Sequence, residues 1–147
     1  MEWAALIAWV VTAGGGFILL AIWLQRGGMR QSGPRRITPP LILSHFLLAA
    51  GGLVVWIIYL AADKDALAWI ALAVLGVVAV LGWTMFFIWY AQRGRHATVE
   101  AHSASPGGVP AVAAEQHFPV AIVALHGLLA VTTVVLVLLA AAGVGGS

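Results

Sequence analysis

Two histidines, His45 and His126, lie inside apolar stretches, and each opens the same short element, His-x-Leu-Leu-Ala. An ionisable side chain within a membrane span is costly and therefore indicates a functional site. Neutral imidazole is a strong ligand for transition metals, including haem iron. Two imidazoles at matching positions therefore predict one ligand that is held from both sides.

The elements that carry these histidines are predicted from composition. Of the 147 residues, 63% are hydrophobic and only 8% are charged, which is far too apolar for a soluble domain. A bilayer crossing needs about 20 apolar residues. We expect one all-α integral membrane domain over residues 1–147, a four-helix bundle with spans near residues 3–24, 40–61, 67–91 and 118–142. The chain has no cysteine, which excludes thiolate haem ligands and iron–sulfur clusters and leaves histidine or methionine for redox chemistry.

The basic residues predict the orientation of the bundle. Six of the seven lie between the first two spans or after the third: Arg26, Arg30, Arg35, Arg36, Arg93 and Arg95. Cytoplasmic loops carry such an excess, so both termini are expected outside the cell, across the inner (plasma) membrane of a bacterium. Membrane topology thus explains the excess of basic over acidic residues in the chain, and nucleic-acid binding has no support. Tryptophans are expected near both membrane interfaces, as in an ordinary aromatic belt. The outer ones are Trp3, Trp56 and Trp69, and the inner ones are Trp23 and Trp89.

The spans also predict an internal duplication. The first and third spans end on Ile-Trp pairs that contain Trp23 and Trp89, and a glycine, Gly16 or Gly82, lies six residues before each pair. The second and fourth spans share the histidine element, with proline before each. We interpret the chain as two tandem helix-pair repeats in the same orientation, related by an axis along the membrane normal.

This arrangement brings the two histidines to similar depths. At 1.5 Å per residue they differ by only about 5 Å along the second and fourth spans, both in the cytoplasmic half of the bilayer. These two helices are diagonal partners in a four-helix bundle, so the imidazoles can face each other across its centre. A planar macrocycle between them needs small neighbours on the same helix faces or at the same depth on the other two helices. The candidates are Ala49, Gly52, Ala130, Thr133, Gly16 and Gly82.

With these features the chain resembles the four-helix haem-binding bundle of respiratory cytochrome b and other small membrane b-type cytochromes. The resemblance covers most of the chain but is architectural and has no diagnostic motif. It implies one haem b per chain near the cytoplasmic side, with His45 and His126 as axial ligands and with glycines of the first and third helices making room. Cytochrome b carries a second histidine pair one leaflet away, but Ile58 and Leu139 occupy those positions here, so an outer haem is not supported.

Arginines near the cytoplasmic ends of the spans are candidates to neutralise the haem propionates. Arg35 and Arg36, just before the second span, are the best placed, followed by Arg26 and Arg93. The positive-inside bias explains all four without a cofactor.

The remaining histidines are weaker candidates. His117 lies nine residues before His126, on the opposite helix side, and is expected at the membrane interface. His96 and His102 fall in a predicted cytoplasmic loop over residues 92–117, where solvated histidines are the simplest interpretation. A zinc site made by the two membrane histidines alone would be short of ligands.

Three functions remain open. The first is a membrane electron-transfer protein with one bis-histidine haem b, an electron carrier or a subunit of a larger redox complex rather than a complete enzyme. One haem in the inner leaflet cannot carry an electron across about 30 Å, so a redox protein, a quinone or a second copy must complete the path. The alternatives are a non-redox accessory subunit whose histidines only pack helices, and a haem or metal carrier or sensor.

Overall fold

The computed structural model describes residues 1–30, 36–100 and 113–144, and the regular elements in these ranges are helical. In chain order they are α1 (Glu2–Gln25), the 3-10 turn η1 (Gly28–Arg30), α2 (Pro39–Ala62), α3 (Asp65–Glu100), the 3-10 turn η2 (Ala114–His117) and α4 (Val120–Ala141). Each of the four α-helices is long and apolar enough to cross a membrane, with Asp65–Arg93 as the candidate span within α3. The prediction of an all-α chain with four helices that can span a membrane is confirmed for the described residues, and each candidate span begins and ends within two residues of its predicted bounds.

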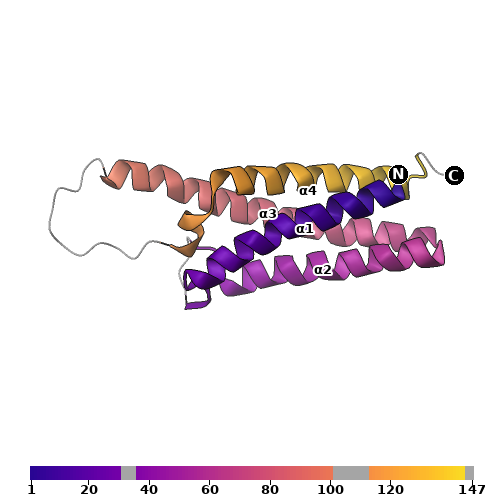
Figure 1. Cartoon of the computed structure of the whole chain (residues 1–147), viewed down its shortest axis with the longest axis horizontal. Coiled ribbons are helices and arrows are strands. Elements are labelled where there is room, and N and C mark those ends of the chain that lie inside the picture. Colours follow the sequence, from indigo (N-terminus) through magenta and orange to yellow (C-terminus); the bar gives the residue numbers. More distant parts are fainter. Residues whose placement is uncertain (31–35, 101–112, 145–147) are drawn as a thin grey trace.

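The four helices lie side by side along one axis (Figure 1). The N-terminus and the last turn of α4 lie at one end of the bundle together with the α2–α3 turn, and η1 and η2 lie at the opposite end. We call these the terminal end and the loop end. α1 packs mainly against α4 and α2 mainly against α3, with smaller contacts between α1 and α2 and between α3 and α4. α2 and α4 are therefore diagonal partners, as expected.

Local sequence explains where α2 begins and ends. Proline disfavours helical backbone in the residue before it, and Thr38 is accordingly extended. Pro39 then occupies the first helical position, where its missing N–H costs nothing. At the other end Asp63 adopts a left-handed conformation with φ of 49° and donates its N–H to the carbonyl of Tyr59. Only Asp63 and Lys64 separate α2 from α3, so these helices form a tight antiparallel pair.

The third helix is longer than the sequence analysis predicts. Residues 92–100 were expected to begin a loop, but α3 continues to Glu100, and His96 lies on this helix rather than in a loop. The segment after Arg93 has no proline before Pro106, and its one glycine, Gly94, costs a helix only about 1 kcal/mol. His102 lies outside the described residues.

The outward faces of the helices are apolar. Leu47 on α2, Val80 on α3 and Leu128 on α4 are each about two-thirds exposed, and many other aliphatic side chains are half exposed. A helix that is apolar on all sides is expected in lipid. These faces are therefore suited to contact the lipid bilayer.

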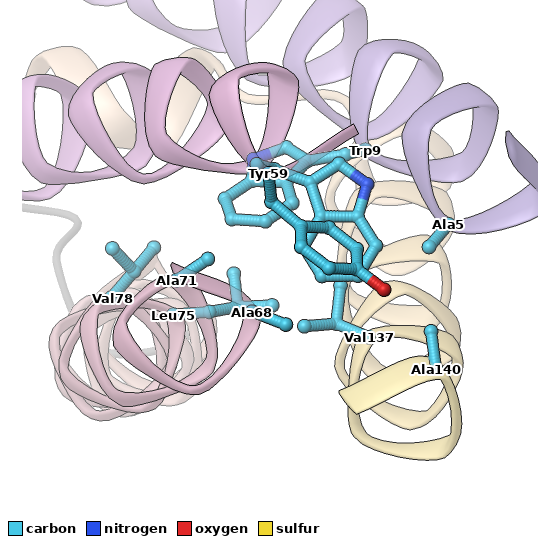
Figure 2. Close-up of a cluster of buried hydrophobic side chains, with 10 residues drawn as sticks. Ala5, Trp9, Tyr59, Ala68, Ala71, Leu75, Val78, Val137 and Ala140 are labelled. Carbon is cyan, nitrogen blue, oxygen red and sulfur yellow. The ribbon is translucent and has the colours of Figure 1, made fainter. Parts of the chain in front are cut away.

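Two buried clusters fill the interior. The terminal cluster lies toward the terminal end and receives side chains from all four helices (Figure 2). It consists of Ala5, Trp9, Trp56, Tyr59, Ala68, Ala71, Leu75, Val78, Val137 and Ala140. The loop-end cluster consists of Trp23, Ile37, Ile42, Trp89, Ala114 and Phe118. The region between the two clusters contains the histidines.

Three of the tryptophans assigned to the interfacial belts lie inside the bundle instead. Trp23 and Trp56 are fully buried and Trp89 is 5% exposed, so their indoles pack inside the bundle. Trp3 and Trp69, at the terminal end, are exposed, as residues of an interfacial belt are expected to be. Hydropathy gives the depth of a residue in a span but not the rotation of the helix about its axis, which neighbouring helices determine.

Candidate functional site

The two membrane histidines meet in the interior of the bundle. His45 is six residues after Pro39, the first residue of α2, and His126 is six residues after Val120, the first residue of α4. Because α2 and α4 run in the same direction, this equal spacing places the imidazoles at the same level. Their ring centres are 6.4 Å apart, with an angle of 66° between the ring planes. The expectation that the two rings face each other between diagonal helices therefore agrees with the geometry.

Each imidazole is oriented by a backbone carbonyl of a neighbouring helix. Nδ1 of His45 lies 3.0 Å from the carbonyl oxygen of Val78 on α3, and Nδ1 of His126 lies 3.0 Å from that of Thr12 on α1. A carbonyl oxygen can only accept, so Nδ1 carries the hydrogen in both rings. In the neutral imidazole Nε2 then keeps its lone pair, and within the described part of the chain neither Nε2 has a hydrogen-bond donor. This is the tautomer in which histidine binds a metal through Nε2.

A glycine makes each of these contacts possible. Gly82 lies four residues after Val78, and Gly16 lies four residues after Thr12, so each glycine stands over the accepting carbonyl on its helix face. A Cβ atom on Gly82 would lie 3.2 Å from Cε1 of His45, and one on Gly16 would lie 3.1 Å from Cε1 of His126. Any larger side chain would push the ring away. The sequence analysis selected both glycines as room for a macrocycle, and in this structure they lie directly against the histidine rings.

The separation of the rings is suited to a shared metal. An imidazole nitrogen lies about 2 Å from a bound metal and the ring centre about 1 Å farther, so two imidazoles on one metal have centres about 6 Å apart.

The chain matched no protein-family model, no curated protein and no solved structure. The chemistry of the pair is therefore inferred from its own side chains.

The other small residues predicted around the histidines have different surroundings. Ala49 packs against the terminal cluster, and Ala130 is half-buried. Gly52 is covered by the ring of Trp9, which a Cβ atom would approach to 3.1 Å. Thr133 is buried, and its hydroxyl lies 3.1 Å from the hydroxyl of Thr12, the residue whose carbonyl accepts from His126. Gly52 and Thr133 thus lie where the histidine region meets the terminal cluster.

The predicted arginines lie at the loop end. Arg36 is half-buried just before α2, and Arg26 is exposed just after α1. The guanidinium of Arg93 lies 5.0 Å from the ring centre of Trp89, in cation–π contact. Arg35 lies outside the described residues.

No further metal-binding cluster appears in the described ranges. His117 is exposed in η2, as expected for an interfacial residue, and no group of three or more His, Cys, Asp or Glu side chains is gathered there. A metal bound by His45 and His126 needs other ligands, which a porphyrin supplies through its four nitrogens.

Sequence reasoning missed one polar residue, Glu115. This glutamate of η2 is completely buried. Its Oε1 atom accepts hydrogen bonds from the backbone N–H of Ile37 at 3.1 Å and from Nε2 of Gln92 at 2.9 Å. Gln116 donates in turn to Oε1 of Gln92. Glu115 therefore ties the connector before α4 to the start of α2 and to α3. A glutamate in a segment of small residues gives no periodic signal of burial, so hydropathy could not identify it.

Replacing Glu115 by alanine is expected to destabilise the protein by about 3 kcal/mol, because the buried N–H of Ile37 and the half-buried amide of Gln92 lose this acceptor. Thermal unfolding in detergent, followed by circular dichroism, measures the effect. Glu115→Gln is the matched control, since it keeps the accepting oxygen and should remain close to wild type. An alanine variant as stable as wild type would show that the carboxylate does not hold the connector.

Proposed function

We propose that this chain is a membrane electron carrier that binds one haem b through His45 and His126. The observation that supports this most strongly is the pair itself: two imidazoles from diagonal helices, 6.4 Å between centres, each held by a backbone carbonyl through Nδ1. Both Nε2 atoms then carry the lone pairs that axial ligation of iron requires.

The surrounding residues fit a haem in three further respects. Gly16 and Gly82 leave α1 and α3 without side chains beside the rings. The donor set contains only neutral nitrogens, which suits haem iron better than a zinc ion short of two ligands. Arg36, with Arg35, is proposed to neutralise propionate charge at the loop end. Bound there, haem b would supply a one-electron iron couple, and with both axial positions taken by protein it would carry electrons rather than bind oxygen.

We also propose that the bundle arose by duplication of a helix pair. Gly16 and Thr12 contact His126 with the same four-residue spacing with which Gly82 and Val78 contact His45. These matched contacts support an axis along the membrane normal that exchanges α1 with α3 and α2 with α4.

The loop end is proposed to face the cytoplasm of a bacterial cell. Arg26, Arg30, Arg36 and Arg93 lie toward that end, whereas Lys64 is the only basic side chain in the α2–α3 turn at the other. The positive-inside rule then places both termini outside. The haem lies in the cytoplasmic leaflet in this arrangement, and a redox protein, a quinone or a second copy of the chain would relay the electron farther.

A specific observation also favours a second function, that of a non-redox accessory subunit. The imidazole hydrogen bonds join α2 to α3 and α1 to α4, which are the two most extensively packed helix pairs. Interhelical hydrogen bonds of this kind stabilise membrane bundles by about 0.6 kcal/mol each. In that case the histidines hold helices together and need no cofactor.

An absorption spectrum separates the two functions. The protein is produced in cells supplied with ample haem, purified in detergent, and recorded reduced with dithionite minus oxidised, with a pyridine haemochrome assay to identify and count haem. We expect sharp low-spin b-type bands and one haem per chain. A colourless, folded protein would overturn the electron-carrier proposal in favour of the accessory subunit.

A further inference from the structure

Two buried tryptophans of the loop-end cluster have no acceptor for their indole N–H groups. Nε1 of Trp23, on α1, and Nε1 of Trp89, on α3, are both inaccessible to solvent, and no hydrogen-bond partner for either lies within the described residues. The indole nitrogen can only donate. A buried donor without an acceptor costs free energy, so an acceptor bound beside either indole would stabilise the folded chain.

The two indoles occupy equivalent positions relative to the histidine site. Trp23 follows Gly16 by seven residues, and Trp89 follows Gly82 by seven residues. Seven residues are nearly two helical turns, so each tryptophan lies on the same helix face as its glycine and about 10 Å farther toward the loop end. One unpartnered donor therefore lies on each of α1 and α3, at the same level.

A planar ring between two axial imidazoles lies perpendicular to the line that joins them. His45 and His126 come from α2 and α4, so such a ring extends toward the other diagonal pair, α1 and α3, and along the bundle axis. Haem b carries its two propionates side by side on one edge of the ring. With that edge toward the loop end, one carboxylate faces the side of α1 and the other the side of α3.

We propose that the indole N–H groups of Trp23 and Trp89 donate to the two propionate carboxylates of the haem, one indole to each. This inference rests on the proposed haem site and assigns the groups that determine which way the cofactor points. Arg93, over the ring of Trp89, contributes positive charge on the same side.

The buried carboxylate of Glu115 is the competing acceptor at this end. Its Oε2 atom also has no partner in the described ranges, but neither indole is bonded to it. An ordered water could join one indole to this oxygen, because buried waters commonly satisfy such groups. Two donors on opposite helices, however, match two carboxylates better than they match one oxygen atom.

The test compares two ligands of the apoprotein: haem, and haem dimethyl ester, whose esterified propionates carry no negative charge. Affinities are measured by absorption titration in detergent for wild type, Trp23→Phe, Trp89→Phe and the double variant. A hydrogen bond to a charged group should contribute about a tenfold effect. We expect each single variant to bind haem about tenfold more weakly. The loss for the ester should be clearly smaller, because its carbonyl oxygens carry no charge and accept only a weaker hydrogen bond.

Trp56→Phe is the matched control. Trp56 is equally buried and its indole N–H also lacks an acceptor among the described residues, but it belongs to the terminal cluster. This variant should bind both ligands as wild type does. Ester binding close to that of wild type in the Trp23 and Trp89 variants serves as the internal control for folding.

The outcomes distinguish this inference from the function on which it rests. If wild type binds neither ligand, the haem site itself is wrong and this inference falls with it. If wild type binds haem and ester equally, or if the phenylalanine variants lose affinity for both ligands to the same extent, the haem site stands. The tryptophans then only pack, or are satisfied by water.

Discussion

Replacing either His45 or His126 by alanine is expected to remove the haem completely from the purified protein. With one axial ligand left, the low-spin six-coordinate state cannot form, and the b-type bands of the reduced spectrum should disappear in both variants. The measurement is the haem-to-protein ratio together with the reduced-minus-oxidised spectrum. Imidazole added to either variant during reconstitution should restore a low-spin spectrum, because it can replace the missing ligand.

His117→Ala is the matched control for these variants. His117 is exposed in η2, outside the spans, and its removal should leave the haem content unchanged. If the histidines only joined helices, the alanine variants would each lose about 0.6 kcal/mol of stability. Wild type and variants alike would then purify without haem absorption. Retention of a full low-spin spectrum by either alanine variant would contradict the axial assignment.

The second large effect is expected from leucine at Gly82 or Gly16. Even a Cβ atom at these positions would come within 3.2 Å and 3.1 Å of a histidine ring, so the branched side chain of leucine must displace the imidazole from its carbonyl acceptor. Overpacking of this kind costs about 1–3 kcal/mol. We expect haem affinity to fall at least tenfold and the thermal midpoint to decrease.

The same two helices offer matched controls. Gly76 on α3 and Gly14 on α1 face open space, with nothing within 4 Å of an added Cβ atom. Gly76→Leu and Gly14→Leu make the same glycine-to-leucine change on α3 and α1 without approaching a histidine. Leucine is also the better helix former by up to about 1 kcal/mol. They should bind haem as wild type does. Equal losses in the Gly76 and Gly82 variants would mean that the histidine contact is not the cause.

Sequence was sufficient to predict the elements and the level of the site. Four apolar runs of about 20 residues predict four spans, because span length follows from membrane thickness. The shared histidine element predicts that His45 and His126 lie at one level, and in the structure their ring centres are 6.4 Å apart. The contacts of Gly16 and Gly82 were predicted only in part. Both were selected for their depth, but the carbonyls that orient the rings, those of Thr12 and Val78, were not foreseen.

What sequence could not provide is the rotation of each helix about its axis. The helices are apolar on all sides, so no polar face marks the side exposed to water, and the same pattern is compatible with several rotations. That is why Trp23, Trp56 and Trp89 were assigned to interfacial belts, and their burial inside the bundle was not foreseen. Glu115 was missed for a related reason, since its burial depends on a tertiary hydrogen bond from Ile37 in a distant part of the chain.

The order in which the helices pair has a consequence for biogenesis. α2 and α3 are joined by two residues and can associate as soon as both have entered the membrane, which already gives His45 its acceptor on Val78. α1 must wait for α4, the last of the four helices to be synthesised, before Thr12 can orient His126. A nascent chain therefore presents one ordered imidazole, and only the fully inserted protein presents two. Loading of the proposed haem would thereby be restricted to finished bundles, and a truncated chain that lacks α4 would not retain it.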